Sequence, residues 1–382
     1  MIPEIGHYAL ILALCVAVVQ GTLPIYGAAV GNSSLMAVAR PAARGQFLLV
    51  LLAFCCLAGC GFDDRPVTMG GAVFGTSWSL TYTNASEVVD PTAVRAEIES
   101  VFELVNSSMN HYQPTSLISR FNALPADAPV EVDWDFAYVL STALTLNEAT
   151  GGAYDVTVSA LSELWGFGPE GPTRFPTPLA VTDAMRSVGG EQLSWQPEIR
   201  LLAKKVPGLA LDFSSLAKGY AVDLGADALD DAGVAQYMLE IGGEVRVRGL
   251  SPRGDAWRIA VESPLAETRG AVQAALAVTD VGIATSGDYR NFFEHEGRRY
   301  SHLINPLTGY PIQHDLVSVT VVHGSAMMAD AWATALTVMG STQALAVAEQ
   351  RDLAVYLLRR SGNELETLTS TSMTQWIEPV AP

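Results

Sequence analysis

The sequence contains no cysteine beyond Cys60, although the chain has 382 residues. All four cysteines, Cys15, Cys55, Cys56 and Cys60, lie within the first 60 positions. The rest of the chain therefore has no disulfide framework, no thiol nucleophile and no cysteine-bound metal.

Basic residues are also scarce. The chain has 22 Lys and Arg against 40 Asp and Glu, which gives a formal net charge of −18. Nucleic-acid binding needs clustered basic side chains, so this composition argues against it. A phosphate-bearing ligand would need a cation at its binding site to offset the local repulsion.

The composition is that of a folded protein. Hydrophobic residues make up 49% of the chain and charged residues only 16%, which allows a large core. Strand-like and helix-like segments are mixed without strict alternation, so we expect an α+β fold. Helices are expected from Asp90-Pro91, at 134–149, at 215–229 and around 329–336, and strands at 72–83, 209–213, 257–262, 274–285, 298–304, 316–323 and 354–359, with a hairpin at Gly242-Gly243.

The segment "ARPAARGQFLLVLLAFCCLAGC" (39–60) has the layout of an export signal. Arg40 and Arg44 form a basic region, and the apolar stretch 47–58 follows. The closing "LAGC" resembles a bacterial lipobox, which implies cleavage before Cys60 and lipidation of its thiol. We therefore expect a lipoprotein held at a membrane by its N-terminus.

A transmembrane helix is the alternative, but the apolar run 47–58 is short for a span of about 20 residues. A second apolar stretch lies upstream at 8–30; it is either a real extra span or outside the protein, if translation starts at Met36. We expect a signal region over 1–59, a lipidated cysteine and tether over 60–71, and one catalytic body over 72–382.

The stretch "ADAWATAL" (329–336) places two polar residues on an otherwise apolar helix. Asp330 and Thr334 are four residues apart, so their side chains lie on one face, one turn apart. A buried carboxylate must be paired, hydrogen-bonded or metal-bound. One interpretation is a partial Mg²⁺ shell, because Mg²⁺ takes few oxygen ligands from protein. The other is an Asp that braces a neighbouring loop.

The stretch "LDFSSLAKGYAVD" (211–223) begins with Asp212 and leads into a helix. Ser214 and Ser215 can cap that helix, and Lys218 lies in its first turns. A helix N-terminus with a lysine attracts anions, but this motif alone favours a plain serine-capped helix with a solvated lysine.

Polar residues are dense between 282 and 311. Ser286, Asp288, Arg290, His302 and Asn305 fall within one expected hairpin. His302 is either a structural histidine or a catalytic one. The glycine pairs in "LEIGGEVRVRG" and "GGAYDVT" are explained by ordinary turns.

Taken together, eight motifs resemble one family in its motif order: "FGTSW", "MNHYQPTSLISRFN", "GGAYDVTVSALSELWGFG", "LDFSSLAKGYAVD", "EIGGEVRVRG", "ATSGDYRNFF", "YSHLINPLTGYP" and "ADAWATAL". This order resembles the ApbE family, the FAD:protein FMN transferases, over residues 69–345. The resemblance implies a T-fold-like body of mixed, largely antiparallel sheets with packed helices. It also implies transfer of FMN from FAD to a Thr or Ser hydroxyl of an acceptor protein, with Mg²⁺ required and AMP released.

The resemblance also implies partners and residue roles. Acceptors in the family are membrane subunits of sodium-pumping NADH:quinone oxidoreductase and Rnf-type complexes, and members are exported to the periplasmic side of the cell inner membrane. Asp330, Thr334 and Ser215 match Mg²⁺ ligands, the last through its backbone. His302 matches the candidate catalytic base. The positions that match FAD contacts are Phe74, Tyr112, Ala153, Tyr154, Asp155, Asp212, Lys218 and Leu303.

The chain departs from the family at two points. Phe74-Gly75-Thr76 stands where the family has Met-Gly-Thr, and Asn305 stands where many relatives have Asp. Two further functions remain open: an FAD pyrophosphatase that yields FMN and AMP at the same site, and a flavin-binding lipoprotein without turnover.

Overall fold

The structure is a computed structural model that describes residues 2–58, 66–83, 89–168, 175–264, 271–287, 291–362 and 364–378. The chain divides into two units, one of N-terminal helices and one that comprises 66–83 and everything from Val89 onward. Cys60, Asp288 and Arg290 lie outside the described residues.

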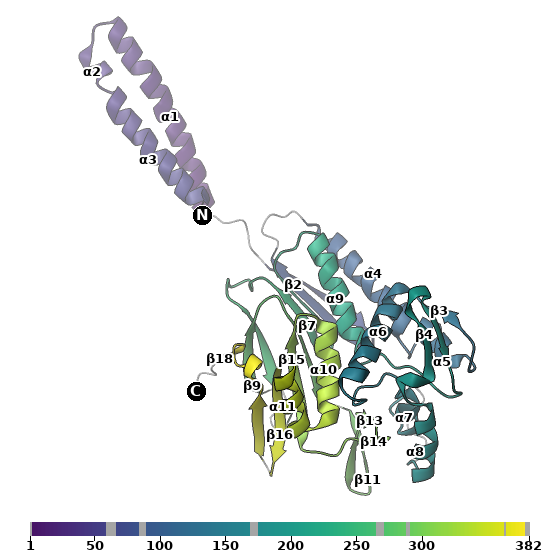
Figure 1. Ribbon diagram of the computed structural model, residues 1–382. Helices are drawn as coiled ribbons and strands as arrows, with labels where there is room; N and C mark the ends of the chain where they lie inside the picture. Colours follow the sequence, from purple (N-terminus) through teal and green to yellow (C-terminus); the bar gives the residue numbers. More distant parts are fainter. Residues whose placement is uncertain are drawn as a thin grey trace. The chain divides into compact units, whose positions relative to one another are not determined.

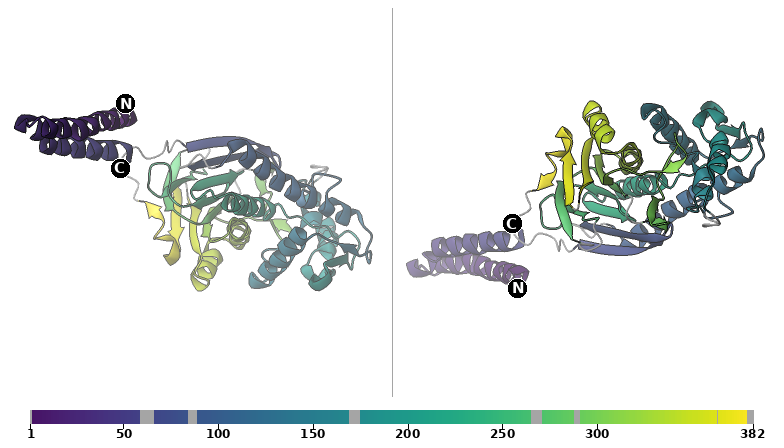
Figure 2. Two further views of the ribbon diagram at one scale, coloured as in Figure 1. Left: turned by 90° about the horizontal axis from the view of Figure 1, so that it is seen from above. Right: turned by 90° about the horizontal axis from the view of Figure 1, so that it is seen from below.

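The N-terminal unit is a pair of antiparallel helices, α1 and α3, which lie side by side in every view (Figures 1 and 2). Its elements are α1 (Ile2–Ala29), α2 (Ser33–Met36) and α3 (Ala39–Ala58). The small side chains of Ala9 and Ala53 are buried, whereas Phe47 is 67% exposed. His7–Ala29 and Ser33–Phe54 are both long and apolar enough to cross a membrane, as a signal sequence also is. Helix α3 is thus longer than the apolar run 47–58, and its length does not exclude a transmembrane helix.

An antiparallel sheet of eight strands forms the centre of the second unit, in the order β1-β2-β6-β7-β10-β15-β16-β17. The strands are β1 (Pro66–Val73), β2 (Thr76–Thr83), β6 (Tyr237–Ile241), β7 (Glu244–Arg248), β10 (Gly282–Gly287), β15 (Leu316–His323), β16 (Ala354–Ser361) and β17 (Glu364–Thr369). Because β1 is part of this sheet, residues 66–71 are not the tether that the sequence indicates.

The middle strands of this sheet are covered on both faces. In β16, Val355 and Leu357 pack in one core, and Tyr356 and Leu358 pack in another on the opposite face, as the period of two requires. The second face is covered by a three-stranded antiparallel sheet of β8 (Trp257–Glu262), β9 (Val272–Val278) and β18 (Ile377–Glu378).

Helices cover the first face. Figure 1 shows α9 and α10 lying next to each other along the sheet, with α4 beside α9. Helix α11 lies beside α10 and β16, whereas α5, α7, α8 and β3–β5 gather at the other side of the unit (Figure 1). The helices are α4 (Pro91–Met109), α5 (Leu117–Ala123), α6 (Trp134–Ala149), α7 (Ser159–Leu164), α8 (Pro178–Ala184), α9 (Ala217–Asp231), α10 (Ala326–Met339) and α11 (Ser341–Gln350), and the short strands are β3 (Val130–Glu131), β4 (Leu193–Gln196), β5 (Leu201–Lys204), β11 (Phe292–His295), β12 (Arg298–Ser301), β13 (Ile304–Asn305) and β14 (Tyr310–Pro311).

The expected α+β fold with largely antiparallel sheets is confirmed, and so are most elements. Helix α4 starts at Pro91 after the cap Asp90, which accepts a hydrogen bond from the Thr92 N–H. Two expected strands are each divided in two. The stretch 72–83 turns at Phe74-Gly75, both at positive φ, and 274–285 turns after Val278.

The prediction of a strand at 209–213 is wrong. Apart from one bridge at Ala210, the segment has no strand partner. Instead the Asn122 side chain hydrogen-bonds both the N–H and the carbonyl of Leu211, at 2.8 and 2.9 Å. A side-chain amide thus replaces the backbone of a neighbouring strand.

Candidate functional site

A cavity of about 380 Å³ lies between α9, α10, β7 and the 302–306 segment. Polar side chains from distant parts of the chain face it. The expected site residues that line it are Tyr112, Ala153, Tyr154, Asp155, Asp212, Ser215, Lys218, His302, Leu303, Asp330 and Thr334. Among the described residues, the structure therefore brings together every expected site residue except Phe74.

Asp330 and Thr334 lie on α10, as their spacing predicts. The helix is deeply buried: Ala329, Ala333 and Ala335 are 0% exposed, and Asp330 itself is 6% exposed. The Asp330 carboxylate accepts a hydrogen bond from the Gly219 N–H, but its Oδ2 is buried without a partner. Burial raises the pKa of Asp330, and the nearby Lys218 ammonium offsets part of this effect.

An unsatisfied carboxylate oxygen in a cavity is costly unless a ligand or cation meets it. Thr334 lies one turn further along α10, and Ser215 faces the same cavity. Among the described residues no cluster of three or more His, Cys, Asp and Glu could hold a metal by itself. Asp330, Thr334 and Ser215 thus offer only some of the oxygen ligands that a metal needs. Such a partial set suits Mg²⁺ bound together with phosphate oxygens and water.

Lys218 forms an ion pair that the sequence did not reveal. Its Nζ lies 2.5 Å from Oε1 of Glu244, whose side chain is 5% exposed. The other oxygen of Glu244, Oε2, is buried without a hydrogen-bond partner and Glu244 lines the cavity. Burial raises the pKa of Glu244, the Asp330 carboxylate adds to this, and Lys218 lowers it. In the sequence, the one hint of this ion pair is the position of Glu244 directly after Gly242-Gly243.

The first turn of α9 is not capped by serine, which corrects the expectation. The helix starts at Ala217, and its cap Leu216 offers no side-chain hydrogen bond. The Ser215 hydroxyl instead lies 2.9 Å from the buried Tyr154 hydroxyl. The Ser214 N–H donates to Asp212 Oδ1 at 2.8 Å. These bonds orient the loop before α9 toward the cavity.

The 151–157 segment reaches the cavity through a turn. Gly151 and Gly152 have φ of 61° and 85°, a region that favours glycine. Asp155 accepts two hydrogen bonds from Thr157, from its N–H at 2.8 Å and its hydroxyl at 2.6 Å. The Asp155 side chain therefore holds its own loop.

His302 is held by the backbone of Asn291. Its Nδ1 lies 3.0 Å from the Asn291 carbonyl oxygen. A carbonyl only accepts, so Nδ1 carries the proton in this contact and Nε2 is the basic nitrogen of the neutral ring. Asn305 does not line the cavity; its side chain accepts from the Leu307 N–H and forms the turn.

Two aromatic residues expected to contact FAD differ in their place: Tyr112 lines the cavity and Phe74 does not. Tyr112 is 60% exposed, and its neighbour His111 lies 3.4 Å from Asp212. Phe74 lines a smaller cavity of about 90 Å³, which also contacts Tyr112 and Lys218. Phe74 thus lies beside the main cavity and not in its wall.

Comparison with known proteins agrees with this geometry. The ApbE family model matches residues 74–357. The chain is 39% identical to the FAD:protein FMN transferase of Haemophilus influenzae over 84% of this chain and 94% of the relative. It is 40% identical to that of Vibrio cholerae over 86% of this chain and 97% of the relative.

Solved structures give the same result. The flavin transferase ApbE from Vibrio cholerae superposes with a TM-score of 0.76 at 39% identity, over 82% of this chain and 99% of that structure. The apo flavinyl transferase ApbE of Pseudomonas stutzeri superposes with a TM-score of 0.77 at 34% identity, over 84% of this chain and 99% of that structure. On the match of both sequence and fold, the chain belongs to the ApbE family.

Proposed function

We propose that this enzyme transfers FMN from FAD to a Thr or Ser hydroxyl of an acceptor protein, with Mg²⁺ required and AMP released. The observation that carries the proposal is the unpartnered Oδ2 of Asp330, buried in a cavity that Thr334, Lys218 and His302 also line. The relatives named FAD:protein FMN transferase support the donor and the class of acceptor.

Asp330, Thr334 and the Ser215 backbone carbonyl would hold the Mg²⁺. This set fits the ion because it is all oxygen and incomplete. When bound, the ion supplies positive charge that neutralises pyrophosphate oxygens as the P–O bond breaks.

Lys218 binds and orients the pyrophosphate. Its ammonium is held by Glu244, so its position is fixed before the substrate arrives. A positioned charge costs no reorganisation during the reaction. Because Glu244 also neutralises that charge, Lys218 alone does not make the cavity positive.

His302 takes the proton of the acceptor hydroxyl on Nε2, since Nδ1 is held by the Asn291 carbonyl. The hydroxyl oxygen forms a bond to the FMN phosphorus, and the pyrophosphate P–O bond breaks. AMP leaves with the electron pair of that bond. The product is a phosphoester between FMN and the acceptor.

Tyr112 and Phe74 would pack against the apolar parts of FAD. Tyr112 is largely exposed at the cavity, and Phe74 lies next to it around the smaller apolar cavity. Flat aromatic rings suit stacking on a flavin or adenine ring. Leu303 and Ala153 add apolar surface to the cavity wall.

We propose further that the mature protein is a lipoprotein anchored through Cys60 on the periplasmic side of the inner membrane. The two N-terminal apolar helices are compatible with a signal or with an anchor. Such a location suits acceptors that are membrane subunits of sodium-pumping NADH:quinone oxidoreductase or Rnf-type complexes.

The test mixes the detergent-solubilised full chain with FAD, Mg²⁺ and a Thr-bearing acceptor domain, followed by intact mass and nucleotide analysis. We expect the acceptor mass to increase by that of one FMN, and one AMP to be released for each transfer. FMN and AMP with an unchanged acceptor would indicate a pyrophosphatase instead. Intact FAD throughout would indicate a flavin-binding protein without turnover.

A further inference from the structure

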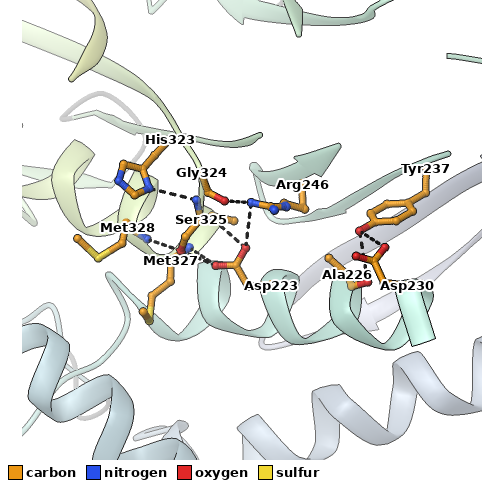
Figure 3. A network of polar contacts seen from close by, with 11 residues as sticks. Asp223, Ala226, Asp230, Tyr237, Arg246, His323, Gly324, Ser325, Met327 and Met328 are labelled. Atoms are coloured by element: carbon orange, nitrogen blue, oxygen red, sulfur yellow. Dashed lines mark hydrogen bonds and ion pairs between the residues drawn. The ribbon is translucent and has the colours of Figure 1, made fainter. Parts of the chain in front are cut away.

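Helices α9 and α10 hold each other through carboxylates that reach across to the partner's backbone. From α10, Asp330 accepts a hydrogen bond from the Gly219 N–H of α9. From α9, Asp223 accepts from the N–H groups of Ala326 and Met327, at 2.9 and 3.0 Å. Figure 3 shows the Asp223 side chain pointing from its helix into the start of α10. Each helix thus supplies an acid that binds the first turn of the other.

Asp223 completes the N-terminal cap of α10. The Ser325 hydroxyl donates to Asp223 Oδ2 at 2.6 Å and accepts from the Met328 N–H at 3.2 Å. The first N–H groups of a helix have no partner within the helix, and a carboxylate there is also favoured by the helix dipole. A single side chain of α9 therefore satisfies the end of α10 and fixes where α10 begins.

The loop before α10 is tied to the same carboxylate. Arg246 Nη1 lies 3.8 Å from Asp223 Oδ1 and also donates to the Gly324 carbonyl. The His323 Nδ1 accepts from the Ser325 N–H at 3.1 Å. Figure 3 shows Arg246 and Ser325 meeting at Asp223, with His323 contacting Ser325 from the other side. Asp223 itself does not line the catalytic cavity.

The two helices are in backbone contact at this point. A Cβ added to Gly219 would lie 2.5 Å from the Ala326 carbonyl oxygen and 2.6 Å from the Met327 Cα. Lys218 is the residue before Gly219, and Asp330 follows Ala326 by about one turn, or roughly 6 Å along the axis. The position of α10 along α9 therefore sets the distance between Asp330 and Lys218.

We propose that Asp223 is a positioning residue for the metal-binding side of the cavity. It fixes the position of α10 along the axis of α9, so that Asp330 and Thr334 lie beside Lys218 and Ser215. Binding sites of this kind tolerate displacements of only about 0.5 Å. This inference rests on the proposed function, in which Asp330 and Thr334 bind Mg²⁺.

The test compares Asp223→Asn with Asp227→Asn in the full chain. Asp227 is an exposed acid one turn further along α9, near Asp223 and Arg246. Its variant removes the same charge from this neighbourhood but leaves the hydrogen bonds of Asp223 to the start of α10 in place. Mn²⁺ binding is measured by titration, with and without ADP as a pyrophosphate that cannot donate FMN. We expect Asp223→Asn to weaken Mn²⁺ binding about tenfold, on the order of 1.4 kcal/mol. Asp227→Asn should bind Mn²⁺ as the unmodified chain does.

Hydrogen exchange gives a readout that does not depend on activity. We expect Asp223→Asn to speed exchange at Ala326 and Met327, and also at Gly219, whose partner is Asp330 and not Asp223. Faster exchange confined to 325–328, with Mn²⁺ affinity unchanged, would overturn the proposal. So would equal losses of metal affinity, metal-free FAD affinity and melting temperature, which indicate general destabilisation.

Two further variants keep the outcome decisive. If Asp223→Asn does not fold, Ser325→Ala removes only the bridging hydroxyl and should weaken Mn²⁺ binding in the same direction, by about two- to threefold; no change would overturn the proposal. Asp330→Ala separates the two hypotheses. If Asp330→Ala binds Mn²⁺ normally, the metal assignment of the proposed function is wrong. If Asp330→Ala loses Mn²⁺ binding and Asp223→Asn keeps it, Asp223 is not a positioning residue.

Discussion

The Glu244 carboxylate lies 2.5 Å from the Lys218 ammonium, inside the cavity where a pyrophosphate is expected to bind. The ion pair cancels the only positive charge among the described side chains that line this cavity. Asp330, Asp212 and Asp155 add negative charge to it. A metal-free cavity of this kind repels pyrophosphate, so metal and FAD should bind with strong mutual dependence.

Glu244→Gln should raise the affinity for FAD in the absence of metal several-fold. The amide keeps the shape and a hydrogen-bond acceptor for Lys218 but removes the opposing charge. Flavin fluorescence titration in EDTA measures the change, with Asp227→Asn as the charge-matched control. Metal-free FAD affinity equal to that of the unmodified chain would show that Lys218 does not face the phosphates.

The same variant should change how stability depends on pH. Burial raises the pKa of Glu244 from its ordinary value of 4.5 to about 7, so the folded protein binds this proton more tightly than the unfolded chain. Its contribution to the free energy of unfolding is therefore lost as pH rises from about 4.5 through the raised pKa. The melting temperature of Glu244→Gln minus that of the unmodified chain should therefore become more positive as pH rises from 4.5 to 8. Calorimetry without metal measures both melting temperatures.

Asp330→Asn should lose metal-dependent turnover by at least about a hundredfold while the protein becomes slightly more stable without metal. The variant removes a buried carboxylate charge whose Oδ2 has no partner. A gain of about 1 kcal/mol corresponds to a melting temperature about 2–4 °C higher for a domain of this size. Full metal-dependent activity in this variant would refute Asp330 as a metal ligand.

His302→Ala should bind FAD normally but transfer FMN about 10²–10⁴-fold more slowly, the usual contribution of a general base. Single-turnover transfer and FAD titration separate the two effects. His314→Ala is the control, because His314 is exposed and does not line the cavity. Loss of FAD binding in His302→Ala would assign the ring a structural role.

Phe74→Gly should relieve backbone strain and weaken FAD binding. Phe74 has a φ of 50°, a conformation that glycine adopts without cost. The melting temperature should fall, because the lost packing of Phe74 against Phe102 and the core outweighs the relief of strain. The KM for FAD should rise several-fold at unchanged kcat. An unchanged KM would show that FAD does not contact the smaller cavity beside Tyr112.

Much of the fold could be predicted from local sequence signals. Asp90-Pro91 and the spacing of Val94, Ile98 and Phe102 fixed α4, because capping and helical periodicity are properties of neighbouring residues. The segment 209–213 was predicted as a strand because its apolar residues Leu209, Leu211 and Phe213 alternate with others, a pattern that a strand also shows. Only the tertiary fold brings Asn122 to Leu211.

The candidate site divides in the same way. Asp330 and Thr334 could be paired from sequence because they share a helix face. Glu244 could not be linked to Lys218, since β7 and α9 meet only in the folded body. The Ser215 side chain was expected at a helix cap, but the distant Tyr154 competes for it.

The order of strands in the central sheet has a consequence for how this protein acquires its activity. Strand β2 pairs with β6, so Trp78 lies opposite Ile241, and the cavity draws on segments from Tyr112 to Thr334. Contacts of such long sequence separation form slowly and late. A growing chain that still lacks the C-terminal segments therefore cannot assemble this cavity, and the complete cavity reports that nearly the whole body has been synthesised and folded.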